Sequence, residues 1–188
     1  MTKKLFFFNH GVGGNCHSAF IDSTRSKLEE KGMKTVAPSY PNPADPNFDE
    51  WKDTFHQFLA DNWNGEEIVM IGHSLGGFFT LRLLGECFDE DWTKKLTAVI
   101  LVAPTATKRP NRRKFYSEEI KWDNILKINF KPILLYSDND DKVAREHPDY
   151  VVEKIGQMAG FEFIEPKGFF HFIMPEAQPV LDAVFRFV

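Results

Sequence analysis

Residues 68–77 of this chain read IVMIGHSLGG, a short apolar run followed by the pattern G-x-S-x-G around Ser74. The apolar run predicts a buried strand, and the mostly apolar residues 78–84 predict a helix directly after it. A serine on a sharp turn between the two is lifted clear of the sheet, while glycines at positions 72 and 76 let the backbone pass without collision. The pattern therefore predicts Ser74 as a nucleophile for acyl transfer.

A serine hydroxyl is a weak nucleophile at neutral pH and needs an imidazole that accepts its proton and an acid that holds the imidazole. His171 lies after the last predicted strand, and Asp140 lies in an acidic loop after the strand before it. We predict His171 as the general base and Asp140 as the acid, and Asp138 and Asp141 stay open as alternatives. The chain order Ser, Asp, His is that of α/β-hydrolases.

Acyl transfer also needs amide donors for the oxyanion that forms in the transition state. The amide of Leu75, directly after the nucleophile, is the first expected donor. The second should come from the glycine-rich loop after the first predicted strand, which reads NHGVGG over residues 9–14. We expect the Val12 amide, with that of Gly11 as the alternative.

Short apolar runs alternate with longer amphipathic stretches along the chain, a pattern typical of βα units around a parallel sheet. In such a sheet the loops after the strands meet at one edge, where ligands bind. We predict a single domain over residues 1–188 of the α/β class, a three-layer α/β-hydrolase-like sandwich with a mostly parallel sheet of about six strands. The expected strands are 4–8, 34–37, 67–71, 97–102, 132–136 and 162–164.

Four further helices are expected between and after these strands. The first covers about 18–31 and stops at Gly32, and the second begins after Asn47 as N-cap with Glu50 completing a capping box. The third covers about 147–159 and ends at Gly160, and the last carries apolar residues at helical spacing over 180–188.

A large cap domain has no room in a chain of this length. We expect a minimal cap or an open rim, formed by the proline-rich residues 41–46 and the region around Phe115, Tyr116 and Trp122.

The composition limits the classes of binding partner and the location that we expect for the protein. The formal net charge of −4 argues against a nucleic-acid or anionic-membrane binder, and the basic run 108–114 is interpreted as a solvated loop. No apolar stretch is long enough to span a bilayer. The two cysteines, Cys16 and Cys87, cannot form a disulfide framework, which favours a cytoplasmic location.

Two motifs that suggest cofactor or metal binding are incomplete. Residues 11–16 match part of the dinucleotide pattern G-x-G-x-x-G, but the sixth position is Cys16. The acidic loop from Asp138 lacks the glycine and the final glutamate of a calcium loop. We therefore expect no cofactor and no metal.

Several of these motifs together resemble one known family. The H-G-x-G-G loop at residues 10–14, the G-H-S-L-G-G elbow and the S-x-x-D-x-x-V loop at residues 137–143 are similar to those of the small serine hydrolases related to retinoblastoma-binding protein nine and YdeN. The resemblance implies that Asp140 is the catalytic acid. The chain departs from the family where a glycine usually precedes the histidine, because Phe170 stands there. It also lacks the L-x-C-x-E motif, so no retinoblastoma-type partner is expected.

The sequence thus predicts a cofactor-independent, carboxylesterase-like serine hydrolase that cleaves a small ester, thioester or related acyl compound through an acyl-Ser74 intermediate. The alternative is a protein-interaction module that keeps the hydrolase architecture and has lost turnover.

Overall fold

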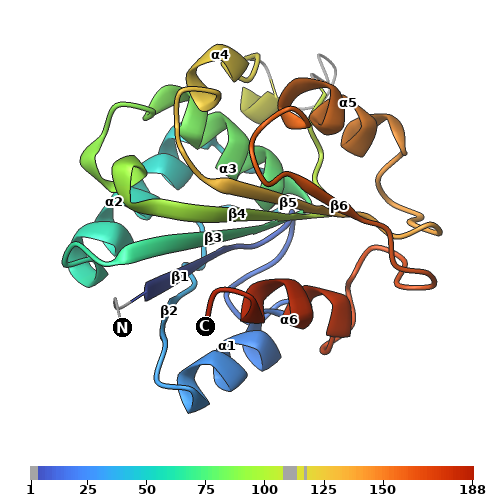
Figure 1. The fold of residues 1–188 in the computed structure, drawn as a ribbon, viewed down its shortest axis with the longest axis horizontal. Helices are drawn as coiled ribbons and strands as arrows, with labels where there is room; N and C mark the ends of the chain where they lie inside the picture. Colours follow the sequence, from blue (N-terminus) through green and yellow to red (C-terminus); the bar gives the residue numbers. More distant parts are fainter. Residues whose placement is uncertain (1–3, 108–113, 117) are drawn as a thin grey trace.

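Six strands form one sheet in the computed structural model, which describes residues 4–107, 114–116 and 118–188. Every neighbouring pair is parallel, in the order β2-β1-β3-β4-β5-β6 (Figure 1). All six predicted strands are confirmed to within two residues at each end. They are β1 (Lys4–Asn9), β2 (Lys34–Val36), β3 (Glu67–His73), β4 (Leu96–Val102), β5 (Lys131–Leu135) and β6 (Glu162–Ile164).

Helices cover both faces of the sheet, which confirms the predicted three-layer α/β architecture. Helices α1 and α6 lie on one face, and α2, α3, α4 and α5 lie on the other (Figure 1). The bounds are α1 (Ile21–Glu30), α2 (Phe48–Asn62), α3 (Leu75–Glu86), α4 (Trp122–Ile125), α5 (Glu146–Ile155) and α6 (Gln178–Phe185), with short 3-10 turns η1 (Asp91–Lys95) and η2 (Lys114–Tyr116).

The strands are apolar along their length because both of their faces are buried. In β1, Leu5 and Phe7 pack with α2 and α3, while Phe6 and Phe8 pack with α1 and α6. All four side chains are at most 1% exposed. This burial of successive residues explains why the strands appear in the sequence as continuous apolar runs.

The order of the strands also places the site. The chain passes from β1 outward to β2 and then crosses back to β3 on the other side of β1. The loops after β1 and β3 therefore diverge to opposite faces, and such a switch point is where open α/β sheets bind ligands.

The start of α2 confirms the predicted N-cap but not the predicted capping box. Asn47 is the N-cap, and its side-chain oxygen accepts hydrogen bonds from the amides of Asp49 and Glu50. The expected capping box is incomplete, because the Glu50 carboxylate instead accepts a hydrogen bond from the Asn42 side-chain amide.

Helix boundaries differ from the predictions at several points. Helix α6 ends at Phe185 instead of residue 188, because the last residues form turns. Helix α1 begins at Ile21 instead of about residue 18, because Ala19 is held in a left-handed conformation with φ of 54° and cannot join a helix. Helix α5 ends at Ile155 instead of residue 159. Gly156 follows it, and separate turns then lead to Gly160, whose φ is +75°.

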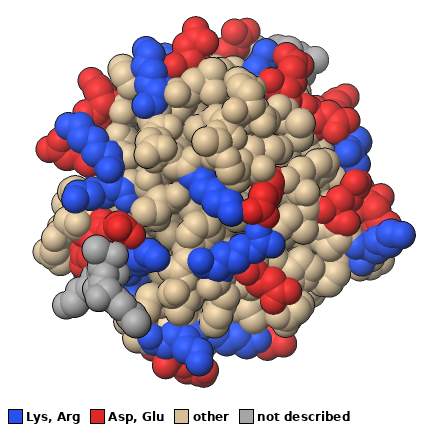
Figure 2. All heavy atoms as spheres, viewed as in Figure 1, with Lys and Arg blue, Asp and Glu red and all other residues tan. Residues whose placement is uncertain are grey.

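The surface carries charges of both signs. On the face shown in Figure 2, Lys and Arg side chains are interspersed with Asp and Glu. Residues 108–113 of the basic run lie outside the described part of the chain. None of the helices in the described part is long and apolar enough to cross a membrane.

The first turn of α3 lies against the end of β1 at a distance that only glycine allows. A Cβ atom on Gly76 would lie 2.1 Å from the Asn9 carbonyl oxygen and 2.5 Å from that of His10. A Cβ on Gly72 would lie 2.7 Å from the Gly76 oxygen. The two glycines of G-x-S-x-G are therefore required by backbone contacts on either side of the turn.

We expect Gly76→Ala to lower the free energy of unfolding by about 3 kcal/mol or more, because backbone atoms must move to admit the methyl group. Gly32→Ala is the matched control, since Gly32 has a φ of +75° but open space around it. It should cost only the backbone strain, about 1 kcal/mol. Urea unfolding of both variants measures the difference, and equal losses would contradict the steric explanation.

Candidate active site

Ser74 occupies the turn between β3 and α3 in a strained backbone conformation, with φ of 54° and ψ of −117°. Its amide donates to the Val102 carbonyl of the neighbouring strand over 2.9 Å. Its carbonyl accepts from the amides of Gly77, Phe78 and Thr105. These four bonds hold a non-glycine residue in a conformation that it would otherwise leave.

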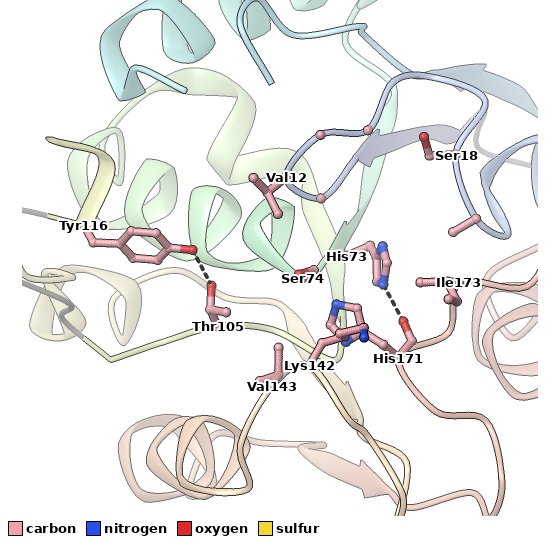
Figure 3. A pocket seen from close by; sticks show the side chains of 14 residues that line it. Val12, Ser18, His73, Ser74, Thr105, Tyr116, Lys142, Val143, His171 and Ile173 are labelled. Carbon is pink, nitrogen blue, oxygen red and sulfur yellow. Dashed lines mark hydrogen bonds between the residues drawn. The ribbon is translucent and has the colours of Figure 1, made fainter. Parts of the chain in front are cut away.

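A pocket of about 520 Å³ opens above this turn (Figure 3). Both Ser74 and His171 line it, and the glycine-rich loop after β1 forms one wall. Apolar and polar groups are mixed around it, because its lining includes the exposed Val12 and Ile173 as well as Thr105 and Tyr116, which carry hydroxyls. The remaining lining residues include Gly11, Ser18, Ala19, His73, Lys142 and Val143.

Asp140 and His171 are brought together from loops 31 residues apart in the chain. The Nδ1 atom of His171 lies 2.9 Å from Asp140 Oδ2, and the two side chains are 7% and 0% exposed. Asp140 Oδ1 accepts hydrogen bonds from the amides of Lys142 and Val143, which fixes the carboxylate. This arrangement leaves Oδ2 for the imidazole.

The two alternative acids lie elsewhere. Asp138 accepts a hydrogen bond from the amide of Gly168. Asp141 is half-exposed and pairs with Lys142 over 2.8 Å, and this pairing lowers the pKa of its carboxyl. In the described part of the chain, Asp140 is the one of the three whose carboxylate is bonded to the His171 ring.

Side chains of the 137–140 loop bind successive groups of the 168–171 loop. Gly168, Phe169 and Phe170 donate their amides to Asp138 Oδ1, Ser137 Oγ and Asn139 Oδ1, each over 2.9 Å. The imidazole of His171 continues the series on Asp140. The acidic loop thus positions the backbone of the histidine loop as well as its ring.

The residues on either side of His171 have left-handed backbones. Phe170 has a φ of 46° and Phe172 a φ of 55°. The first of these fits the glycine that the family resemblance implies at this position, since glycine adopts a positive φ without a steric penalty. Here phenylalanine takes the same conformation, held by the bond from its amide to Asn139.

Ser74 and His171 share the pocket, but no hydrogen bond joins Ser74 Oγ to the His171 ring in the described part of the chain. Contacts between a nucleophile and its base often form only when substrate is bound. The structure therefore places the two residues at one site without the contact that proton transfer requires.

The Leu75 amide faces away from the bonds that hold Ser74. In a planar trans peptide the C=O and N–H groups point in opposite directions. The Ser74 carbonyl is held by three amides, so the Leu75 N–H of the same peptide points to the other side.

Neither Leu75 N nor Val12 N has an acceptor among the described residues, whereas the Gly13 amide is bound to Pro43 O. The Gly11 amide also has no acceptor among the described residues, so the amides of Val12 and Gly11 both remain candidates for the second oxyanion donor.

His73 holds the backbone of His171. Its Nε2 atom donates to the His171 carbonyl over 2.8 Å, and the two rings lie 5.0 Å apart (Figure 3). Burial, with the nearby His171 ring as the next cause, lowers the pKa of His73 to about 4. No sequence signal indicated this contact, because it depends on the position of a loop 98 residues away.

The predicted rim is only partly present. Tyr116 lines the pocket, and its hydroxyl lies 3.3 Å from Thr105 Oγ1. Phe115 is fully buried between Trp51 and other aromatic rings, and Trp122 packs against Tyr150 away from the pocket. Residues 41–46 support the glycine-rich loop through the Pro43 carbonyl instead of lining the pocket.

One side-chain cluster elsewhere has atoms that metals bind. The ligand atoms of His56, Cys87 and Glu90 lie within 4.8 Å of one another. The Glu90 carboxylate, however, already accepts hydrogen bonds from His56 and Trp92, and burial raises the pKa of the Cys87 thiol to about 12. A protonated thiol is a poor metal ligand. The cluster is explained by its internal hydrogen bonds.

The strain at the histidine loop predicts opposite effects for two neighbouring variants. Phe170→Gly should raise the free energy of unfolding by up to about 1 kcal/mol, because the left-handed strain of about 1–2 kcal/mol exceeds the extra entropy of glycine in the unfolded chain. Phe172→Gly is the matched control, since its fully buried ring should cost about 3–5 kcal/mol when removed. Thermal unfolding measures both, and a clear loss of stability in Phe170→Gly would contradict the assignment.

The low pKa of His73 predicts an acid-sensitive fold. Between pH 6.5 and 4 the unfolded chain binds a proton on this residue and the native protein does not, so unfolding becomes easier as the pH falls. The contribution is up to about 1.4 kcal/mol per pH unit. His73→Gln keeps an N–H donor and removes the titration. Urea unfolding between pH 4 and 7 should therefore show a smaller slope in the variant, and identical slopes would refute the prediction.

One known protein matches part of the sequence. The protein YdeN of Bacillus subtilis (strain 168), named as a hydrolase, is 27% identical over 110 residues, which is 58% of this chain and 55% of YdeN. The alignment thus spans about half the length of that relative.

Solved structures show the same fold over nearly the whole chain. The crystal structure of YdeN has a TM-score of 0.79 at 19% identity and covers 99% of this chain and 98% of its own. Alpha/beta hydrolase domain-containing protein 10 from mouse has a TM-score of 0.73 at 16% identity, with coverage of 97% and 88%. Est1E from Butyrivibrio proteoclasticus, solved with ferulic acid bound, has a TM-score of 0.71 at 17% identity, with coverage of 99% and 88%.

A sequence model of the serine hydrolase family matches residues 24–168, which include Ser74 and Asp140 but neither the glycine-rich loop nor His171. The match covers well over half of the sequence. With the fold of the α/β-hydrolases and a serine at the elbow, this chain belongs to the serine hydrolase family.

Proposed function

We propose that the protein is a cofactor-independent hydrolase that cleaves a small ester, thioester or related acyl compound through an acyl-Ser74 intermediate. The observation that supports this best is the hydrogen bond between buried Asp140 and His171, in a pocket that also contains the strained Ser74. The bond occupies Nδ1 and leaves Nε2 of the imidazole to exchange a proton in the pocket.

The reaction then proceeds in two steps. In the first, Ser74 Oγ attacks the acyl carbon while His171 Nε2 takes its proton, and the leaving group departs with that proton. In the second, water attacks the acyl-enzyme, His171 takes a proton from the water, and Ser74 regains it on release of the acid. Asp140 accepts the hydrogen bond from the imidazolium and stabilises it in both steps.

The oxyanion formed in each step accepts hydrogen bonds from the amides of Leu75 and Val12. Each such donor typically contributes about 3–4 kcal/mol to the stabilisation of the transition state. Neither amide has an acceptor among the described residues, so neither must break a bond within this part of the protein to serve.

The pocket favours small substrates. Its volume of about 520 Å³ accommodates a short acyl or aromatic acyl group, and Val12 and Ile173 offer apolar contacts at its wall. Nitrophenyl esters of increasing acyl length, together with a feruloyl ester chosen from the ligand of the structurally similar Est1E, would locate the preferred size. The expected partner is this small molecule, without nucleic acid or membrane.

A fluorophosphonate probe, which reacts with activated serines, tests the nucleophile. We expect labelling of the wild-type protein and none of Ser74→Ala, and His171→Ala should be labelled far more slowly because the serine loses its base. Absence of labelling in folded wild-type protein would favour the alternative of an interaction module without turnover.

The identity of the acid is tested by three matched substitutions. Asp140→Asn should lower kcat by roughly 10³–10⁴-fold, since it removes the group that orients and stabilises the imidazole. Asp141→Asn should stay within about 3-fold of wild type because its carboxylate is exposed and paired with Lys142. Asp138→Asn should fall between the two, since it loosens the loop that carries His171. A largest loss at Asp138 or Asp141 would overturn the assignment.

A further inference from the structure

His10 is buried behind the glycine-rich loop and takes no part in the reaction above. Its Nδ1 atom lies 2.8 Å from the Gly11 carbonyl oxygen, and its Nε2 atom lies 3.0 Å from the Tyr40 amide nitrogen. A backbone amide can only donate, so Nε2 carries no proton and Nδ1 is the donor. The two contacts together define a single neutral tautomer.

The surroundings favour the same form. Burial lowers the pKa of His10, which keeps the ring neutral at physiological pH. The centre of the ring lies 5.1 Å from that of Trp51, in an edge-on contact, and 5.3 Å from that of Tyr40, in a tilted contact. Other titratable groups near it are His73, whose pKa is about 4, and the Tyr40 phenol, whose pKa burial raises. The imidazole is therefore held in place as a fixed neutral donor.

The bond from His10 determines the direction of a neighbouring amide. The carbonyl of Gly11 accepts from His10 Nδ1 and also from the Gly14 amide over 3.1 Å. The described residues contain no cis peptide bonds, so the Val12 N–H of the same planar unit points the opposite way. The carbonyl faces the buried imidazole, and the N–H therefore faces the open side of the loop, where Val12 lines the pocket.

This loop is close to the nucleophile. A Cβ atom on Gly11 would lie 3.1 Å from Ser74 Cβ. Gly11 is thus a direct neighbour of Ser74, and the Val12 amide follows it in the chain. This amide therefore lies in the region where the oxyanion would form.

We propose that His10 is a positioning residue for the oxyanion hole: by donating to the Gly11 carbonyl it turns the Val12 amide toward the reacting acyl group. The inference rests on the proposed acyl-Ser74 chemistry and adds a side chain to a hole that otherwise consists of backbone. A backbone amide cannot be removed by an ordinary substitution, whereas the group that orients it can.

The chain offers a matched pair of substitutions at this position. In His10→Asn the side-chain amide stands where Nδ1 stood and can still donate to the Gly11 carbonyl. In His10→Gln the side-chain oxygen stands where Nε2 stood, so it can accept from the Tyr40 amide while the Gly11 carbonyl loses its donor. Each variant keeps one of the two bonds, and only the first keeps the bond that the proposal requires.

The test compares the kinetics of a nitrophenyl ester with the affinity of an alkylboronic acid, whose tetrahedral adduct on Ser74 places an oxygen in the oxyanion hole. We expect kcat of His10→Gln to fall about 10–100-fold with KM within a few-fold of wild type, because the lost interaction acts in the transition state. The boronic acid should bind His10→Gln more weakly by a similar factor. His10→Asn should retain at least about tenfold more kcat than His10→Gln.

A purely structural role would change unfolding temperature, or KM and kcat together, without a matching loss of boronic acid affinity. His17→Gln serves as the control, since the His17 side chain is exposed and its ring lies 2.9 Å from the Asp22 carboxylate. The inference is overturned if His10→Gln keeps kcat and boronic acid affinity within about 3-fold of His10→Asn.

A measurement on the wild-type protein covers the case in which neither variant folds. Amide NMR during titration with the boronic acid should move the Val12 and Leu75 N–H signals downfield, and a Val12 signal that does not move overturns the proposal. Failure of the proposed function gives a different result, because the wild-type protein would then show neither fluorophosphonate labelling nor ester hydrolysis. That result would refute the role of His10 together with the reaction.

Discussion

The site depends on the close approach between the first turn of α3 and the end of β1. At Gly76 the two backbones leave no room for a side chain, since a Cβ atom there would overlap the Asn9 carbonyl. This approach brings the Leu75 amide beside the loop that carries Val12, although the two residues are far apart in the sequence. It also forces the chain to turn within one residue, and that residue is Ser74 with its positive φ.

A chain of buried hydrogen bonds stabilises this contact between α3 and β1. Tyr40 donates its hydroxyl proton to Asn9, Asn9 donates to Thr80, and Thr80 donates to the Gly76 carbonyl, over 2.6, 2.8 and 2.7 Å. Such a chain is stabilising only when every member is satisfied, and no buried side-chain nitrogen or oxygen in the described part lacks a partner. The network links β1, the segment after β2 and α3, so it fixes together both backbone segments that carry the proposed oxyanion donors.

The sheet and the elbow could be predicted because their causes are local in the sequence. Strands buried on both faces must be apolar throughout, and the turn needs small residues at fixed distances from the serine. The start of α1 could not be predicted in this way, because Ala19 is left-handed only through its surroundings. Nor could spacing distinguish Phe115, which is core, from Tyr116, which lines the pocket, since aromatic residues suit either place. Asp138, Asp140 and Asp141 lie within four residues. The partners of Asp138 and Asp140 lie in a loop about 30 residues later, whereas Asp141 pairs with the adjacent Lys142.

Three histidines lie within the same region, and their hydrogen bonds give them different capacities for proton transfer. Both ring nitrogens of His10 are occupied, so a proton added to its ring would oppose the Tyr40 amide. His73 has one nitrogen engaged with the His171 carbonyl, and a pKa of about 4 makes it too weak a base to hold a proton near neutral pH. His171 differs because a buried carboxylate lies against Nδ1 and stabilises the charged ring. Of the three, His171 is therefore the one whose hydrogen bonds suit the proposed role of general base.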